Sequence, residues 1–391
     1  MLNQTNVKLG KVRSSIRELF EYGKQRKAEI GADNVFDFSI GNPSVPTPDD
    51  VKKTLIDLIE NTDPVELHGY TSAQGDYSAR SAVANQLNAK FSTELNADCI
   101  YMTCGASASL TVTLNALLNE GDEVIAFVPY FPEYKVFCGH AGGSLIAVNC
   151  DGNFQPDLQD FKAKLSPKTK AVIINSPNNP SGVIYGEQTI KEIVSIINKS
   201  GFPIYIISDE PYRELIFEDT KIPFIMNYYD KSIVCYSYSK SLSLPGERIG
   251  YIAVNNRAPD FGEIYSAVLG AGRALGFVCA PSLFQKLIAT CQGATSDLSV
   301  YRANRDRLIE KLTKFGFGFA EPCGAFYIFL KAPSGNAKEF AERAKQFEIL
   351  LVEGDSFGCN GYVRLSYCVS PDMIERSLPA FKKLAISYNL I

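Results

Sequence analysis

The alternation of short apolar runs with amphipathic segments in the middle of the chain constrains its fold more than any other feature. An uninterrupted apolar run is typical of a strand buried on both faces of a sheet, and a helix between two such strands makes them parallel. We therefore predict an α/β unit with a mostly parallel sheet, in which ligands gather at the carboxyl ends of the strands. The expected strands are 123–128, 171–175, 203–208 and 232–237, and the expected helices are 107–118 and 187–199.

The C-terminal part differs in character and predicts a second, smaller α+β unit. Charged helical segments alternate there with short strands, and the opening segment, with a helix near 14–30 and a strand at 36–40, is expected to pack against them. The expected C-terminal helices are 302–314, 336–347 and 372–388, with strands at 325–330 and 361–366. We therefore expect an N-terminal arm with part of the small domain at 1–45, a large domain at 46–290 and a small C-terminal domain at 291–391.

The composition argues against several classes of function. A chain of 391 residues that is 46% hydrophobic can form a large core, and its net charge of −4, with both signs interspersed, indicates no nucleic-acid or membrane partner. It has no membrane-spanning apolar run and no signal-peptide apolar region. Ten scattered cysteines without paired spacing indicate reduced thiols in a cytoplasmic enzyme. With only His68 and His140, a histidine-based metal site or a Ser-His-Asp triad is not expected.

Lys240 is the first candidate for chemistry. It follows the apolar run 232–237 and is surrounded by serines at positions 237, 239 and 241. Burying an ammonium group costs free energy unless the group loses its proton or finds a partner. One chemical use of a buried lysine is an imine with an aldehyde cofactor such as pyridoxal phosphate. A surface lysine in a serine-rich loop is the alternative that this segment leaves open.

Two other strand ends carry groups that suit such a cofactor. Asp209 follows the run 203–208, with Tyr212 three residues later, and its carboxylate could hold a protonated pyridine nitrogen. Asn179 lies in a turn rich in proline and asparagine after 171–175, where its amide could donate to a phenolate oxygen. A helix N-cap for Asp209 and a plain turn for Asn179 are the structural alternatives.

Three further features could bind an anion, a ring or a carboxylate. The small-residue turn Gly105-Ala106-Ser107 opens a helix, and free N–H groups with the helix dipole attract anions. Phe131 follows a strand and could stack on a planar cofactor, and the fork of Arg364 suits a carboxylate. An ordinary helix start, core packing and a surface arginine are the commoner roles. The stretch 270–276 approximates a dinucleotide fingerprint, but its spacing is one residue too long and no strand leads into it.

In this order, the residues resemble those of the class I and II aminotransferases, which are fold-type I pyridoxal-phosphate enzymes. The match covers nearly the whole chain, and motifs that are weak singly stand in the family's order. The resemblance implies a large domain with a mostly parallel seven-stranded sheet between helices, a smaller α+β domain, and pyridoxal 5'-phosphate as cofactor. The motifs are Gly41-Asn42-Pro43, Tyr70 with Gly75, Gly105-Ala106-Ser107, the aromatic turn 129–134, Asn178-Asn179-Pro180-Ser181-Gly182, Asp209 with Tyr212, Ser237-Tyr238-Ser239-Lys240, Arg248 and Arg364.

The resemblance implies a role in cofactor chemistry for several of these residues. Lys240 would form the imine and later move the proton between the substrate α-carbon and the cofactor. Asp209 would pair with the pyridinium nitrogen, and Asn179 and Tyr212 would hydrogen-bond the phenolic oxygen. Phe131 would stack on the ring, and because the family often has Trp or Tyr there, one accessory hydrogen bond would be lost.

The resemblance also implies how the phosphate is bound and that the active site needs a homodimer. Tyr70 would reach the phosphate held by the neighbouring subunit, so two chains would share their active sites. Within one chain, the residues expected at the phosphate are Gly105, Ala106, Ser107, Ser237, Ser239 and Arg248.

These residues favour an aminotransferase that moves an amino group between an L-amino acid and a 2-oxo acid by a ping-pong mechanism. A β-elimination lyase acting on cysteine conjugates or cystathionine would use the same lysine, aspartate and arginine, and stays open. A non-catalytic regulator on this fold would carry an additional DNA-binding domain, for which there is no room ahead of Gly41.

The substrate is the least determined part of the prediction. Arg364 would bind the α-carboxylate of every substrate, with Gly41 and Asn179 close by. Arg273 falls near the stretch where some aspartate-specific relatives place a basic residue from the partner subunit, although a salt-bridged loop arginine is the alternative. Aspartate or glutamate is therefore favoured, and alanine, aromatic amino acids and kynurenine remain open.

Overall fold

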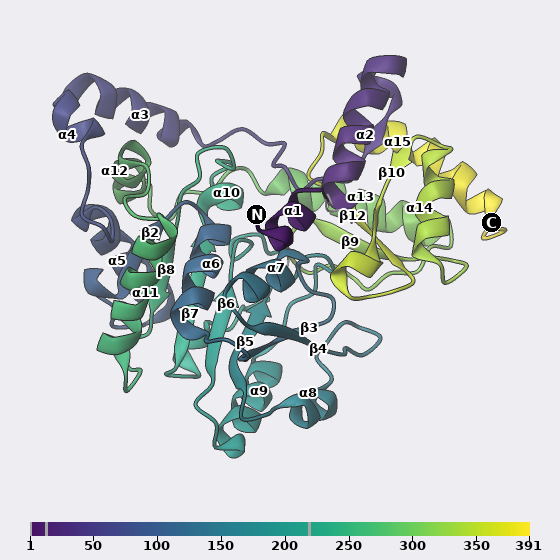
Figure 1. Ribbon diagram of the computed structural model, residues 1–391. Coiled ribbons are helices and arrows are strands. Elements are labelled where there is room, and N and C mark those ends of the chain that lie inside the picture. Colours follow the sequence, from purple (N-terminus) through teal and green to yellow (C-terminus); the bar gives the residue numbers. More distant parts are fainter. Residues whose placement is uncertain (1, 12–14, 218–219) are drawn as a thin grey trace.

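A seven-stranded sheet forms the centre of the computed structural model, which describes residues 2–11, 15–217 and 220–391 (Figure 1). The strand order is β2-β8-β7-β6-β5-β3-β4, and every neighbouring pair is parallel except the two that involve β8. The mostly parallel sheet is therefore confirmed. The strands are β2 Ile100–Thr103, β3 Glu123–Phe127, β4 Ser144–Val148, β5 Thr169–Asn175, β6 Tyr205–Asp209, β7 Ser232–Ser237 and β8 Gly250–Val254.

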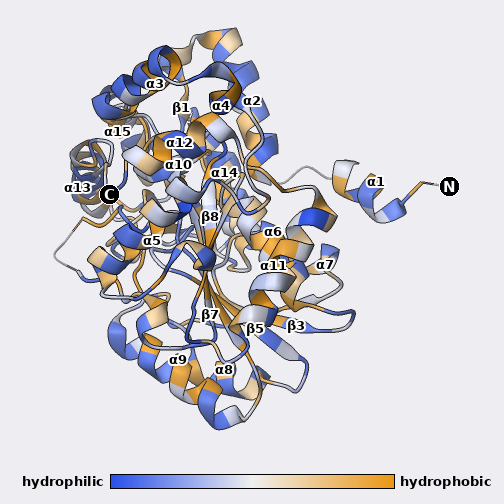
Figure 2. Cartoon of the chain, turned by 90° about the vertical axis from the view of Figure 1, so that its left-hand side faces the viewer, coloured by the Kyte–Doolittle hydropathy of each residue, from blue (hydrophilic) through white to orange (hydrophobic). Residues whose placement is uncertain are grey.

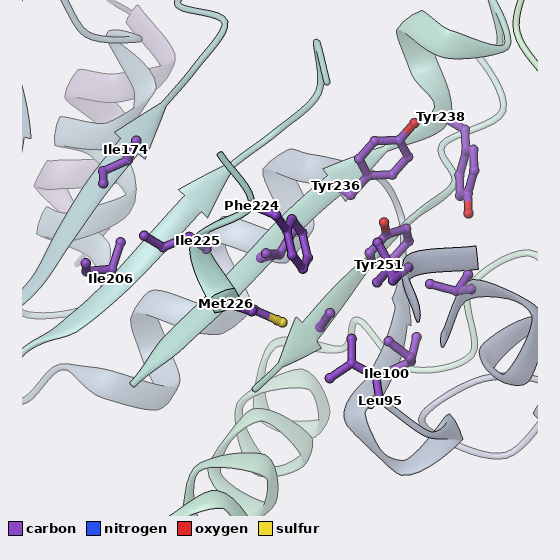
Figure 3. Close-up of a cluster of buried hydrophobic side chains, with 14 of the residues drawn as sticks. Leu95, Ile100, Ile174, Ile206, Phe224, Ile225, Met226, Tyr236, Tyr238 and Tyr251 are labelled. Atoms are coloured by element: carbon purple, nitrogen blue, oxygen red, sulfur yellow. The ribbon is translucent and has the colours of Figure 1, made fainter. Parts of the chain in front are cut away.

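Side chains of the central strands alternate between two apolar layers. On β5, Ala171 and Ile173 face one layer, and Val172 and Ile174 face the other, which is the period of a strand covered on both sides. Figure 3 shows part of the second layer, where Ile225 and Phe224 lie between the isoleucines of β5 and β6, Ile174 and Ile206, and the tyrosines of β7 and β8, Tyr236 and Tyr251. In Figure 2 the central strands are mostly hydrophobic, as burial on both faces requires.

Helices on both faces of the sheet supply the rest of these layers. The first face is covered by α6 Ala106–Leu117, α7 Glu133–His140 and α11 Phe261–Leu275. The second face is covered by α5 Tyr77–Phe91, α8 Leu158–Lys164, α9 Glu187–Ser200 and α12 Ser282–Thr290, with the short η3 Ile225–Asn227. Helices α3 Asp49–Asn61 and α4 Pro64–His68 lie beside α12 at one end of the molecule (Figure 1). The 3-10 turn η2 Ala97–Cys99 leads into β2.

The second unit is smaller and of α+β type, as expected. Its three-stranded antiparallel sheet has the order β11-β12-β9, and its core includes Leu308, Phe340 and Phe381. The strands are β9 Tyr327–Lys331, β11 Val352–Glu353 and β12 Tyr362–Ser366, and the helices are α13 Ser299–Lys314, α14 Ala337–Lys345 and α15 Pro371–Ser387, with the turn η4 Gly354–Phe357.

The opening segment packs against the smaller unit, which agrees with the expectation from the sequence. Strand β1, Phe36–Asp37, pairs in parallel with β10, Ile349–Leu350. On helix α2, Ser15–Ile30, the Arg26 guanidinium lies 2.6 Å from the Glu348 carboxylate. The turn η1, Ala32–Asn34, joins α2 to β1.

The two units have separate cores that meet along a shared boundary. Phe329, Cys359 and Tyr362 of the small unit also contact the large core. Along the chain, α12 and the segment up to Ala294 pack against the large core, and Leu298 and Val300 pack against the small core. We propose that the domain boundary lies between these residues, next to the expected position at 290. Tyr212 and Leu215 of the large unit also enter the small core, so the end of β6 touches both units. None of the described helices is both long enough and apolar enough to cross a membrane.

The expected elements match the observed ones closely, but several observed elements were not expected. Strand β4 is largely half-exposed, so it lacks a continuous apolar run, and β2 is short. The helix expected near 14–30 is α2, and residue 14 lies outside the described residues. The strand expected at 36–40 is limited to β1.

Candidate active site

A cavity of about 260 Å³ opens at the carboxyl edge of the large sheet and is closed on one side by the small unit. The strands β2, β3, β5, β6 and β7 all end at this edge, which is where ligands bind in parallel α/β sheets. The residues predicted from the sequence that line the cavity are Gly41, Ala106, Ser107, Phe131, Asn179, Asp209, Tyr212, Ser237, Ser239, Lys240, Arg248 and Arg364.

Lys240 lies in the single-turn helix α10, Tyr238–Ser241, directly after β7. The Ser237 hydroxyl begins this turn by accepting a hydrogen bond from the Ser239 N–H. The Lys240 ammonium donates to the carbonyl oxygen of Gly41 over 2.6 Å. Burial, together with the positive charges of Arg364 and Arg248, lowers the pKa of Lys240 to about 8. Near neutral pH this lysine therefore exchanges its proton far more readily than an ordinary surface lysine.

Asp209 ends β6 and is buried with one carboxylate oxygen paired and the other free. The Tyr134 hydroxyl donates to Oδ2 over 2.5 Å, and the Asn175 amide donates to the Asp209 carbonyl oxygen over 2.9 Å. Oδ1 has no hydrogen-bond partner among the described residues. Burial raises the pKa of Asp209 to about 7, against the opposing effect of the Tyr134 hydrogen bond. The unpaired Oδ1 can therefore bind a hydrogen-bond donor, such as a protonated nitrogen.

Asn179 and Tyr212 lie on the neighbouring strand ends. The Asn179 side-chain oxygen accepts from Arg364 over 3.0 Å, which leaves its amide nitrogen as a donor, and its backbone N–H donates to the Asn175 side chain over 2.8 Å. The Tyr212 hydroxyl lies 2.9 Å from that of Tyr327. Burial raises the pKa of Tyr212 well above its usual value, so its hydroxyl keeps its hydrogen. Both residues can donate to an oxygen in the cavity.

An anion cradle forms where helix α6 begins. Gly105, at a φ of 85°, precedes the free N–H groups of Ala106 and Ser107, and a Cβ atom at Gly105 would lie 2.8 Å from the Arg248 guanidinium. Arg248 has a φ of 53°, a strained conformation that places it beside this turn. The hydroxyls of Ser237 and Ser239 lie 2.7 Å apart at the same wall. The small-residue turn at 105–107 is weak evidence for an anion site by itself. The fold brings the Arg248 guanidinium and the hydroxyls of Ser237 and Ser239 to the same turn, which strengthens the case.

Arg364 is buried on β12, at the side of the cavity that belongs to the small unit. Its Nη1 donates to Asn179, and its Nη2 donates to the Ser39 carbonyl oxygen over 2.6 Å. Its Nε is buried and has no partner within the part of the chain that the structure describes. A guanidinium that is held in place with donor capacity to spare suits a carboxylate ligand.

Three predicted site residues do not line the cavity of their own chain: Gly105, which adjoins it in the anion cradle, and Tyr70 and Arg273, which lie away from it. Tyr70 is 98% exposed, and Arg273 lies exposed in the last turn of α11. Residues 270–276, which approximate a dinucleotide fingerprint, form the end of this helix and its C-cap. Any role for Tyr70 or Arg273 in an active site would have to be in that of a second subunit.

Three polar residues of the site were not predicted from the sequence. Asn175 and Tyr327 line the cavity, and Tyr134 contacts Asp209 without lining it. Tyr134 lies in the aromatic turn after β3, where the prediction considered ring stacking but not a hydroxyl donor for a buried carboxylate. Asn175 is the last residue of β5, and its side chain contacts both Asp209 and Asn179. Tyr327 begins β9 in the small unit and lines the cavity. Nothing local in the sequence distinguishes it from a core tyrosine.

The cavity residues fit pyridoxal 5'-phosphate, the cofactor that the sequence resemblance implies. An aldehyde can react with a lysine of lowered pKa, and a pyridine nitrogen can meet the unpaired Oδ1 of Asp209. The cradle at the start of α6 offers N–H groups, a guanidinium and hydroxyls to a phosphate. Phe131 lines the cavity, with a ring that can stack on a planar ligand.

Comparisons with known proteins agree with this geometry. A family model described as "Aminotransferase class I and II" matches residues 33–381. An aspartate aminotransferase of Thermotoga maritima is 31% identical over 93% of this chain and 95% of its own length. The glutamate-pyruvate aminotransferase AlaA of Escherichia coli is 27% identical over 93% of each chain. The crystal structure of an amino transferase from Eubacterium rectale is 53% identical, covers 100% of this chain and 99% of its own, and has a TM-score of 0.97.

Proposed function

Since this chain belongs to the class I and II aminotransferases and is a pyridoxal-phosphate-dependent enzyme, we propose that it moves an amino group between aspartate or glutamate and a 2-oxo acid by a ping-pong mechanism. The observation that carries this proposal is the convergence of Lys240, Asp209 and Arg364 on one cavity. These residues bring together a proton carrier, an anion for a ring nitrogen and a cation for a carboxylate. Because Arg364 offers one binding site for a substrate carboxylate in this cavity, the two substrates would bind there in turn, as a ping-pong mechanism requires.

The residues proposed to hold the cofactor line one cavity. Lys240 would hold its aldehyde, Asp209 its ring nitrogen, and Asn179 and Tyr212 its phenolic oxygen, with Phe131 against the ring. When bound, pyridoxal phosphate supplies an electron sink for the pair left behind when the substrate α-carbon loses its proton. The anionic carboxylate of Asp209 keeps the ring nitrogen protonated, which strengthens this sink.

Lys240 is proposed to move the proton. Because its pKa is lowered to about 8, its amine is partly neutral near pH 7 to 8 and can accept the proton of the substrate α-carbon. Its hydrogen bond to the Gly41 carbonyl oxygen holds the amine at the cavity wall. Arg364 meanwhile fixes the α-carboxylate, which orients the C–H bond toward the lysine.

The preference for a dicarboxylic substrate rests on the relatives and on Arg273. The Thermotoga maritima relative is named for aspartate and the Escherichia coli relative for glutamate and pyruvate. The charged residues that line the cavity are Asp209, Lys240, Arg248 and Arg364, and each already has a proposed partner. A distal carboxylate would therefore need a cation from elsewhere, and the exposed Arg273 of a second subunit is our candidate.

A half-reaction screen tests this proposal. The holoenzyme is mixed with one amino acid at a time, and the absorbance of the bound cofactor is followed. Arg364→Ala should depress the reaction of every amino acid, whereas Arg273→Ala should depress only aspartate and glutamate, by roughly ten- to a hundredfold. The exposed Arg302→Ala serves as a control that should change neither. Uniform losses in both variants, or no loss in Arg273→Ala, would exclude the dicarboxylate preference, and ammonia release without an acceptor would indicate a β-elimination lyase.

We also propose a two-fold homodimer in which Tyr70 reaches the phosphate site of the second chain. Tyr70 is 98% exposed and lies in a region whose other exposed apolar residues include Val65 at 81% and Ile59 at 60%. Helix α1, Gln4–Lys11, buries none of its residues and stands apart from the body (Figure 2). Sedimentation should show a dimer, and Tyr70→Phe should weaken cofactor binding. A fully active monomer would contradict both parts.

A reducing compartment, the cytoplasm, is proposed from the cysteines. Cys99, Cys138, Cys235, Cys291 and Cys368 are buried free thiols. Burial raises the pKa of Cys138 to about 12, which makes its thiol inert. Buried, unreactive thiols of this kind are typical of proteins that never meet an oxidising environment.

A further inference from the structure

Tyr327 contacts several site residues at once, although the proposed reaction assigns it no part. It is buried at the start of β9, lines the cavity, and places its hydroxyl 2.9 Å from the Tyr212 hydroxyl. The Arg364 guanidinium carbon lies 4.6 Å from the centroid of the Tyr327 ring. A Cβ atom at Gly41 would overlap the Tyr327 hydroxyl. One side chain of the small unit therefore touches both the cofactor side and the carboxylate side of the site.

The hydrogen bond between the two tyrosines has a direction that the proposed function determines. Either hydroxyl could donate across this distance. Burial raises the pKa of Tyr327 to about 12 and raises the pKa of Tyr212 well above its usual value, so both keep their hydrogens near neutral pH. A tyrosine hydroxyl has one hydrogen to give. If Tyr212 gives its hydrogen to the phenolic oxygen of the cofactor, Tyr327 must be the donor to Tyr212.

The ring of Tyr327 acts on a different residue. In the β9–β12 pair, Tyr327 stands opposite Ser366, so Arg364, two residues away along β12, is its diagonal neighbour on the same face of the sheet. A planar guanidinium packed on an aromatic ring is attracted to it and loses rotational freedom. The unpaired Nε of Arg364 is thereby kept in a fixed position.

We propose that Tyr327 is a positioning residue that acts through two separable contacts. Its hydroxyl orders Tyr212 as a donor to the phenolic oxygen of the cofactor, and its ring aims Arg364 at the substrate carboxylate. This inference rests on the proposed function. The small unit would then influence the ionisation of the cofactor's phenolic oxygen as well as substrate binding.

The first contact has a spectroscopic consequence. A hydroxyl that accepts a hydrogen bond becomes a stronger donor, and a stronger donor favours the ionised form of the phenolic oxygen. The pH midpoint of the absorbance change of the bound cofactor should therefore be lowered by the chain Tyr327–Tyr212. Tyr327→Phe removes the donor but keeps the ring, so the midpoint should rise by about half a pH unit while the KM for amino acids changes less than about twofold.

A double-mutant cycle tests whether Tyr327 acts through Tyr212. Tyr212→Phe should raise the midpoint further than Tyr327→Phe, and adding Tyr327→Phe to Tyr212→Phe should change nothing more. An unchanged midpoint in Tyr327→Phe beside a shifted one in Tyr212→Phe overturns the inference and leaves the proposed function intact. Additive shifts overturn it as well. Failure of the wild-type protein to bind pyridoxal phosphate would overturn both.

The second contact is tested by Tyr327→Leu, which removes the ring. Compared with Tyr327→Phe, it should raise the KM for alanine and aspartate alike by about five- to tenfold, because both share the α-carboxylate. Circular dichroism and cofactor binding confirm that the variant is folded. Equal KM values in the Phe and Leu variants would overturn the proposed role of the ring.

Discussion

Two cavities of similar volume lie at opposite ends of the large sheet, and only one has the features of an active site. The first, of about 260 Å³, lies at the carboxyl ends of the parallel strands, and the second, of about 300 Å³, at their amino ends. The second cavity is lined by residues 92–95 and 255–257 together with Met226. Its location is evident from Asn255, whose N–H donates to the carbonyl oxygen of Ser232, the first residue of β7.

The cavities differ in whether their polar groups are already paired. In the second, Arg257 meets Asp230 over 3.0 Å, Asn256 donates to the Glu94 carbonyl oxygen over 2.8 Å, and Asn255 donates to Ser232. In the first, buried atoms of Asp209 and Arg364 have no partners among the described residues. A buried polar atom without a partner costs about 1–3 kcal/mol. Unpaired buried atoms, rather than volume, therefore mark the functional cavity.

Lys240→Ala should have the largest effect and tests the comparison most directly. Under the proposed function, removing the amine would remove both the covalent attachment and the proton carrier, so transamination should be abolished. Borohydride reduction and peptide mapping should find the cofactor on Lys240 in the wild type only. Lys231→Ala, which breaks a 2.7 Å ion pair with Asp260 near the amino end of the sheet, is the control and should remain active. Normal turnover in Lys240→Ala would reject the assignment.

Asp209→Ala should follow in size. The loss of the anion that we propose keeps the ring nitrogen protonated should lower the rate by about a thousandfold or more, and cofactor binding should weaken. Steady-state kinetics and equilibrium dialysis with pyridoxal phosphate measure the two effects. A rate within about tenfold of the wild type would mean that the buried aspartate is structural, and the distinction between the two cavities would lose its main support.

The cost of the unpaired carboxylate should be visible in the stability of the apoenzyme. Because the pKa of Asp209 is raised to about 7, the folded state binds more protons than the unfolded state between pH 4 and 7, and stability falls as the pH rises through that range. From pH 5 to 7 the loss should be about 2 kcal/mol, because the slope of roughly 1.4 kcal/mol per pH unit flattens as the pH approaches the pKa. Urea unfolding at pH 5 and 8 should show this loss of unfolding free energy in the wild-type apoenzyme but not in Asp209→Asn.

Tyr134→Phe tests the same comparison by removing the short hydrogen bond that the Asp209 carboxylate accepts from the Tyr134 hydroxyl. Without this hydrogen bond the carboxylate loses its fixed orientation and its pKa should rise further, because Tyr134 opposes the effect of burial. We expect kcat/KM to fall about tenfold, and the pH range of apoenzyme destabilisation to move upward. Tyr185→Phe, at a buried tyrosine that lines the same small void as Tyr134, is the matched control. Equal behaviour of the two variants would exclude a specific role for Tyr134.

Arg257→Ala, in the second cavity, should have the smallest effect. Its ion pair with Asp230 is half exposed, and such pairs contribute about 0.2–1 kcal/mol. We expect unchanged kinetics and a loss of about 1 kcal/mol or less in the free energy of unfolding. A large loss of activity would show that the amino-end cavity is also functional.

Much of the fold and of the site was predictable because the signals are local. Burial on both faces gives β5, β6 and β7 continuous apolar sequences, and the residues that end such strands must lie at one edge of the sheet. This reasoning located Asn179, Asp209 and Lys240. It did not find β4, whose residues are mostly half-exposed. It also placed Lys240 at a strand end, whereas the residue lies in the short helix that follows.

The sequence by itself determined which chemical groups the chain can bring to one edge of its sheet, since strand period, helix starts and residue types are local properties. Only the tertiary structure decided which of those groups are paired. Tyr134 takes one oxygen of Asp209 and leaves the other free, and Tyr327 approaches Tyr212 from a strand more than a hundred residues away in the chain. The first contact depends on how α7 packs on the large sheet, and the second on how the small unit packs on the large one. Nothing in the spacing of the residues encodes that packing.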